Sequence, residues 1–150
     1  MKKFKYNLEP VLKLRKFKEE KARRELGFIN QKIQALKQRI QTMNDSIDSS
    51  YQQLSSLTNQ KVKADSIQFF PFYIDDLRKS IRVLEKEVKA LDVEYKLKSD
   101  EVYKLRGEKK ILENHKHKEQ ASFKKKLEIK TNIDLQDEFL ISQGTKEDNL

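Results

Sequence analysis

The sequence predicts an all-α fold in which two long helices form an antiparallel coiled-coil hairpin. Three observations predict this class: the composition favours helix, apolar residues recur in steps of three and four in two stretches, and one non-repeating segment separates the stretches. Of the 150 residues, 38% are charged, and only 3 are glycine and 2 are proline. So few turn-forming residues leave little room for a chain that reverses direction often, and long helices are expected.

The first periodic stretch runs from Leu26 to Leu57, and only Ser50 interrupts it. A seam that persists for more than four heptads is typical of a coiled coil. Its apolar members are Leu26, Ile29, Ile33, Leu36, Ile40, Met43, Ile47, Leu54 and Leu57.

The second stretch has the same rhythm, and Lys98 and Lys109 interrupt it. We expect these polar insertions, with Glu19 near Lys109, to lower stability while helping to fix the register of the two helices. Its apolar members are Ile74, Leu77, Ile81, Leu84, Val88, Leu91, Tyr95, Val102, Leu105 and Leu112.

The helix boundaries are predicted from capping and turn residues. Asn7 is a plausible N-cap that leaves Pro10 in the opening turn, where its missing N–H is harmless. Pro71 suits the first turn of the second helix for the same reason. The expected organisation is helix one at about 7–59, a turn at about 60–71, helix two at about 72–143 with a weak point near 131, and a flexible acidic tail at 144–150.

Two helices of similar length joined by a short connection must fold back on each other, because the connection cannot span a parallel pair. A fold point near residue 66 brings apolar residues of the two seams together in layers. The predicted partners are Ile47 with Leu84, Ile40 with Leu91, Ile29 with Val102, and Leu26 with Leu105.

Several function classes find no support in the sequence. There is no cysteine, so disulfides and thiolate metal sites are excluded. His115 and His117 are two positions apart and point to nearly opposite sides of a helix, so no metal site is expected. There is no phosphate-binding glycine loop and no nucleophile constellation, so we expect no enzyme, no catalytic residues, no cofactor and no small-molecule substrate. The longest apolar run, Phe69 to Ile74, is too short to span a bilayer, so no membrane insertion and a cytoplasmic location are expected.

The net charge of +9 is concentrated in two segments. Residues 1–25 and residues 104–130 each carry ten Lys or Arg against four acidic residues. In a hairpin these segments would meet at the end opposite the turn and form one basic end. Such an end would attract an acidic protein surface or a phosphate backbone, although it would equally serve as a solvated face.

Two apolar surfaces are candidates for partner binding. Aromatic residues crowd the predicted turn, where they would either anchor a partner or pack on one another. A second strip of aliphatic residues lies outside the seam on helix two, where it would seat another helix or be ordinary surface. From these surfaces we single out Phe69, Phe70, Phe72, Tyr73, Val93 and Leu97.

Four stretches resemble the FliJ family of the flagellar export apparatus. The most specific is the opening Phe4-Lys5-Tyr6-Asn7-Leu8-Glu9-Pro10-Val11-Leu12-Lys13-Leu14-Arg15, followed by Glu19, Glu20, Ala22, Glu25 and Leu26. The others, in the same order, are Phe72-Tyr73-Ile74-Asp75-Asp76-Leu77 with Ile81, then Glu108-Lys109-Lys110-Ile111-Leu112-Glu113, and Asp137-Glu138-Phe139.

This resemblance implies a stalk that enters the hexameric flagellar export ATPase and also contacts the export gate membrane protein and export chaperones. It implies a cytoplasmic location, peripheral to the inner membrane at the flagellar base. On this sequence the inserted end would be the basic one, and the aromatic and aliphatic surfaces would face the gate or the chaperones. The expected ring contacts are Arg15, Lys16, Arg23, Arg24, Lys109 and Lys110.

Three other functions remain open on the sequence. The stalk proteins of virulence type III secretion systems have the same architecture. A basic coiled coil that binds nucleic acid would also account for the charge, but no aromatic residues alternate with the basic ones to stack on bases, and no helix-turn-helix or zinc pattern is present. A purely structural spacer is the third.

Overall fold

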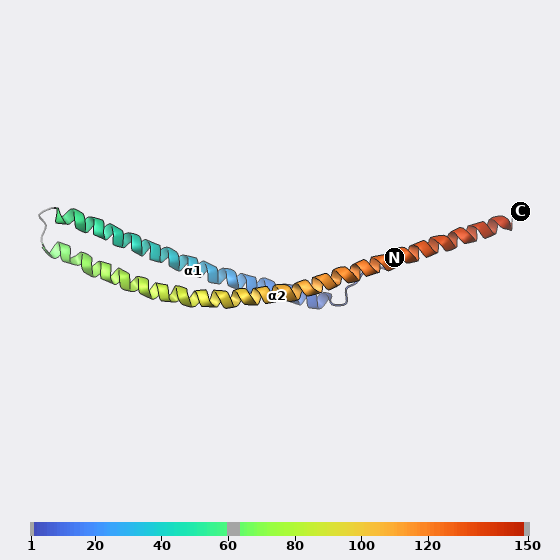
Figure 1. Ribbon diagram of the computed structural model, residues 1–150, viewed down its shortest axis with the longest axis horizontal. Coiled ribbons are helices and arrows are strands. Elements are labelled where there is room, and N and C mark those ends of the chain that lie inside the picture. The colour runs from blue at the N-terminus through green and yellow to red at the C-terminus, as the bar shows by residue number, and fades with distance from the viewer. Residues whose placement is uncertain (1, 60–63, 149–150) are drawn as a thin grey trace. The chain divides into compact units, whose positions relative to one another are not determined.

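The computed structural model describes residues 2–59 and 64–148, apart from the side chain of Ser66, and contains two helices (Figure 1). Helix α1 spans Glu9–Thr58 and helix α2 spans Ala64–Glu147. The helices pack against each other, which confirms the predicted all-α hairpin. The chain divides into two compact units: unit 1 comprises residues 1–19 and 104–150, and unit 2 comprises residues 20–103.

The start of α1 follows from local backbone geometry. The amide of Leu12 donates to the carbonyl of Leu8 at 2.9 Å, so Leu8 provides the first carbonyl of the helix, one residue later than the Asn7 cap that we expected. Pro10 is the second residue of α1, where a missing N–H breaks no intrahelical hydrogen bond.

The start of α2 differs more from the prediction, because residues 64–71 are helical and the expected turn at 60–71 is too long. Residues 60–63 lie outside the described residues. Pro71 is therefore inside α2 and leaves the carbonyl of Ile67 without its i+4 amide partner. Phe69 and Tyr73, four residues apart, stack with ring centroids 5.7 Å apart and offset part of that loss.

The far end of α2 also extends beyond the prediction. The helix is continuous through residue 131, where the Thr131 hydroxyl donates to the carbonyl of Leu127 at 2.9 Å. Gly144 does not end the helix: a glycine stop needs a positive φ, and none of the described glycines has one. Residues 144–147, expected in a flexible tail, are the last residues of α2. Residues 149–150 of that tail lie outside the described residues.

The seam in unit 2 is built from the predicted apolar residues. Ile47, Ile74 and Ile81 form a buried cluster, with Ile40, Met43 and Leu77 packed against it. Ser50 is buried in the same seam and donates its hydroxyl to the carbonyl of Ser46 at 2.8 Å, so the polar insertion is satisfied within its own helix.

The register of the helices differs from the predicted one. A fold point at residue 66 would place Tyr51 opposite residue 80 and Glu25 opposite residue 106. The structure instead pairs Tyr51 with Arg78 and Glu25 with Lys98, and it packs Ile47 with Ile74 and Ile81. Because the connection lies between Thr58 and Ala64, the fold point is earlier, and the partners in α2 move toward its N-terminus.

Candidate functional site

The segment that precedes α1 is held against α2 within unit 1. The Tyr6 hydroxyl lies 2.6 Å from Nδ1 of His115, and their rings are tilted with centroids 5.6 Å apart. Closer to the chain start, the rings of Phe4 and Phe123 lie 5.6 Å apart. These contacts fix residues 4–6 along α2, in the stretch that is rich in lysine.

An ion pair joins the first turn of α1 to α2 in the same unit. Nζ of Lys116 lies 2.9 Å from Oε2 of Glu9. The hydrogen bond from Lys116 holds the pKa of the Glu9 carboxyl below its ordinary value of 4.5, although partial desolvation acts in the opposite direction.

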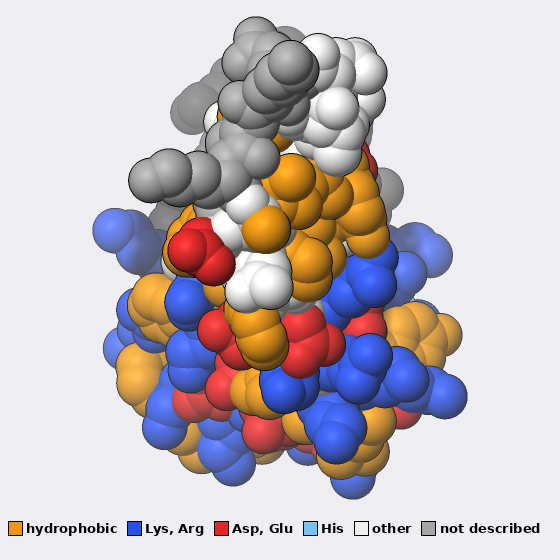
Figure 2. Space-filling view, turned by 90° about the vertical axis from the view of Figure 1, so that its left-hand side faces the viewer, with side chains coloured by type: hydrophobic (Ala, Val, Ile, Leu, Met, Phe, Trp, Pro, Cys, Tyr) orange, Lys and Arg blue, Asp and Glu red, His pale blue; other side chains and the backbone are white. Residues whose placement is uncertain are grey.

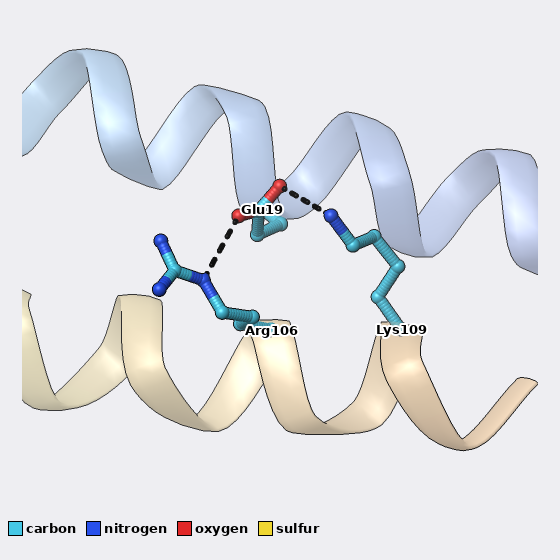
Figure 3. A network of polar contacts seen from close by, with 3 residues as sticks. All are labelled: Glu19, Arg106 and Lys109. Atoms are coloured by element: carbon cyan, nitrogen blue, oxygen red, sulfur yellow. Dashed lines mark hydrogen bonds and ion pairs between the residues drawn. The ribbon is translucent and has the colours of Figure 1, made fainter. Parts of the chain in front are cut away.

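The most buried polar group in the described chain is the Glu19 side chain, with only 1% of the residue exposed (Figure 3). Its Oε2 lies 3.3 Å from Nζ of Lys109, and its Oε1 lies 3.7 Å from Nε of Arg106. A carboxylate can occupy a seam only where cations compensate the loss of water. The expected proximity of Glu19 and Lys109 is therefore confirmed, and Arg106 was not foreseen.

The six predicted ring-contact cations divide into an inward and an outward group. Arg15 donates from Nη1 to the carbonyl oxygen of Glu108 at 2.8 Å, and Lys109 pairs with Glu19, so both hold the helices together. The structure brings Arg15, Lys16, Lys109 and Lys110 together in unit 1, and it places Arg23 and Arg24 in unit 2. The exposed members are Lys16, Arg23, Arg24 and Lys110.

The aromatic residues selected from the sequence lie on the first turns of α2. They pack on one another but are not all buried. Phe69 stacks on Tyr73 and meets Phe70 edge-on at 5.8 Å. Phe72 is nevertheless 73% exposed. Figure 2 looks onto this end of unit 2, where hydrophobic side chains gather on the surface. The expected packing of these rings on one another is therefore confirmed in part, and Phe72 leaves apolar surface in water.

Leu97 lies in a shallow groove of unit 2 with a volume of about 420 Å³, whereas Val93 is exposed but does not line it. Phe28 lines the same groove and was not predicted from the sequence. Phe28 lies next to the seam residue Ile29 but outside the periodic pattern, so no sequence signal marked it. Phe28 and Leu97 are 62% and 67% exposed. The groove is lined by Glu25, Phe28, Ile29, Lys32, Glu94, Leu97, Lys98 and Glu101.

Charged side chains at this groove are paired across the helices. Lys98 contacts Glu25 of α1 and lies 3.0 Å from Glu101 of its own helix. The hydrogen bond from Lys98 lowers the pKa of Glu25, and the hydrogen bonds to Glu25 and Glu101 raise the pKa of Lys98. The groove thus combines apolar surface with fixed charges, which suits a partly apolar helix or peptide.

The described residues contain no group of three or more His, Asp or Glu placed to hold a metal ion. His115 contacts Tyr6, and Nε2 of its ring lies 3.7 Å from Glu119. Neither α1 nor α2 contains, in its described part, a stretch apolar enough to cross a membrane.

Comparison with known proteins supplies the family. A family model described as the flagellar FliJ protein matches residues 4–143. No curated protein and no solved structure matches the chain. The family match includes α1, most of α2 and the contact segment around Tyr6. Because it covers nearly the whole sequence, the chain belongs to the FliJ family of proteins related to flagellar export.

Proposed function

We propose that this chain is a non-enzymatic central stalk of the export ATPase ring, and that it links the ring to the export gate membrane protein and to export chaperones. It acts in the cytoplasm, at the inner-membrane face of the flagellar base. Family membership supports the export role, and the two-helix fold supports a stalk. The single observation that carries the ring contact is the division of the cations in unit 1 into an inward and an outward group.

The inward group gives the stalk its stiffness. Lys109 and Arg106 neutralise Glu19, and Arg15 donates to the Glu108 carbonyl, so each of these contacts ties α1 to α2. A stalk that transmits motion inside a ring needs such cross-links, because two helices joined only by a narrow apolar seam can slide in register.

The outward group supplies the recognition. Lys16 and Lys110 in unit 1 and Arg23 and Arg24 in unit 2 are exposed. We assign these four side chains to acidic loops that line the pore of the ATPase ring. Exposed charges of this kind speed association and are screened by salt.

The test is reversal of the outward charges with ATPase stimulation as the readout. Arg23→Glu with Arg24→Glu, and separately Lys16→Glu with Lys110→Glu, should lower stimulation of ATP hydrolysis, with the largest effect at low salt. A matched control is Lys86→Glu with Lys89→Glu, two exposed lysines of α2 outside the basic segments, which should stimulate normally. Unchanged stimulation and unchanged salt dependence in both test variants would show that these cations do not contact the ATPase ring.

The apolar surfaces are proposed to contact the export gate or the chaperones. Phe69, Phe70, Phe72 and Tyr73 offer aromatic anchors, and Leu97, with the neighbouring Val93, offers an aliphatic one. Phe72→Ala and Leu97→Asp should each weaken binding of the gate or of a chaperone while ATPase stimulation persists. Loss of both activities together would show that these surfaces are not separate from the ring contact.

A nucleic-acid role is distinguished by a pull-down from cell extract with and without nuclease. Recovery of an ATPase and a gate protein after nuclease treatment supports the stalk, and loss of all partners supports nucleic-acid binding. The match to a flagellar family favours the flagellar stalk over its virulence counterpart.

A further inference from the structure

The last part of α2 extends beyond the ring contacts that hold the N-terminal segment in unit 1. Phe123 is the last residue of α2 that touches a ring of that segment, and every residue from Lys124 to Asp148 is exposed. In Figure 1 this is the red end of α2, which continues past the segment that precedes α1. We call residues 124–147 the overhang; at 1.5 Å per residue it is about 36 Å long.

The overhang carries an apolar strip of the same kind as the buried seams. Ile129, Ile133, Gln136 and Leu140 follow steps of four, three and four and therefore share one face of the helix. The three aliphatic members are 57%, 50% and 64% exposed. A helix that stands alone in water gains nothing from such a strip, because helices are stabilised mainly by packing an apolar face.

Charge on the overhang is divided along its length. Residues 124–130 carry four lysines and one glutamate, and residues 134–148 carry five acidic residues and one lysine. The first half is therefore strongly positive and the second half is negative. A helix with this polarity is electrostatically complementary to itself when a second copy runs in the opposite direction.

We propose that the overhang pairs with the overhang of a second copy of this chain in an antiparallel, two-fold symmetric coiled coil. Symmetry about a point between residues 134 and 135 matches Ile133 with Gln136 and Ile129 with Leu140 of the other copy. Each contact then occurs twice, as an isologous interface requires. The strip of each copy covers the strip of the other.

The flanks of the strip agree with this pairing. Lys130 and Asp137 are seven residues apart, so they project from the same side of the strip. In the antiparallel pair Lys130 lies next to Asp137 of the second copy, and Asp137 lies next to its Lys130. A parallel pair would instead place the positive half of one copy beside the positive half of the other, where like charges repel.

The test uses sedimentation of the full chain from micromolar to near-millimolar concentration. The natural chain should form a dimer at the upper end. Ile133→Asp should raise the dissociation constant by roughly tenfold or more, since it buries a charge at the centre of the strip. Because Ile133 is half exposed in the single chain, its helix content should not change.

Exchange of the charges at residues 130 and 137 distinguishes specific pairing from nonspecific hydrophobic association. Lys130→Glu alone and Asp137→Lys alone should each be monomeric, because each creates two like-charge contacts. An equimolar mixture of the two variants should dimerise, and a chain that carries both substitutions should dimerise by itself. The matched control is Lys124→Glu, an equal change of charge on the opposite side of the overhang, which should leave the dimer intact.

The orientation of the two overhangs is measured with spin labels on a cysteine introduced at residue 146. The natural chain contains no cysteine, so each copy carries a single label. An antiparallel pair places the two labels about 35 Å apart, whereas a parallel pair places them within about 20 Å. A chain that stays monomeric at the highest concentration, a dimer unaffected by Ile133→Asp, or a short label distance would each overturn the proposal.

Discussion

Removal of the Lys109 ammonium group should destabilise the chain far more than removal of any exposed charge. Glu19 is 1% exposed, and Lys109 lies 3.3 Å from its Oε2. Lys109→Met keeps the aliphatic part of the side chain but removes this cation from the buried carboxylate, whereas Arg106 stays 3.7 Å from Oε1. A buried charge that loses its partner costs about 3 to 5 kcal/mol, and because Arg106 remains we expect about 3 kcal/mol.

The measurement is urea unfolding followed by circular dichroism. A loss of about 3 kcal/mol should lower the unfolding midpoint by about 1 M or more. Lys110→Met is the matched control, because this neighbouring lysine is exposed and its replacement should change stability by less than about 0.5 kcal/mol. The combination of Glu19→Leu with Lys109→Met should recover the natural stability, since an apolar pair then fills the seam. Equal midpoints for Lys109→Met and Lys110→Met would refute the reasoning.

Three further predictions concern stability. Gly107→Ala should raise the free energy of unfolding by about 0.5 to 1 kcal/mol, because alanine favours helix and an added Cβ meets no atom within 4 Å; a lower thermal midpoint would contradict this. Ile81→Ala should cost about 2 to 5 kcal/mol in chemical unfolding, because Ile81 belongs to the buried cluster of unit 2, and a loss below about 1 kcal/mol would argue against that packing. The Glu25–Lys98 pair should make stability depend on pH at both extremes. The lowered pKa of Glu25 gives stability that is present above its ordinary value of 4.5 and lost as pH falls through the folded value. The raised pKa of Lys98 gives stability that is present below 10.5 and lost as pH rises through the folded value. Glu25→Gln should therefore flatten the acid limb of a stability-against-pH curve, and an acid limb as steep as that of the natural chain would count against the pair.

The helical pairing could be predicted because the sequence encodes it in a repeating pattern. Ile47, Ile74 and Ile81 follow the seam rhythm, and all three are buried. The contact of Glu19 with Lys109 could also be predicted. Polar residues that lie near each other in two facing seams are most stable when they form a pair.

The register and the helix ends could not be predicted with the same accuracy, because they depend on single local choices. Pro71 fits the first turn of a helix on local grounds, yet the chain accepts it deeper in α2, where stacking of Phe69 on Tyr73 offsets part of a lost hydrogen bond. An earlier helix start moves the fold point and shifts the partners of α1 along α2. Gly144 likewise lies inside a helix that it was expected to end.

The candidate site could be predicted only in part from the sequence. Charge counts identify a basic surface, but they do not separate Lys110, which is exposed, from Lys109, which contacts Glu19. The groove residue Phe28 has no periodic signal, because its exposure depends on how the two helices pair and not on its own segment.

The position of Pro71 determines how α2 unwinds. Ahead of Pro71 the helix lacks one hydrogen bond, at the carbonyl of Ile67, so the first two turns cost less to melt than the buried seam that follows them. Melting that stops at the proline leaves Ile74 and the rest of the seam closed. The rings of Phe69 and Phe70 can therefore be released or re-formed as a small separate element, without opening the hairpin behind them.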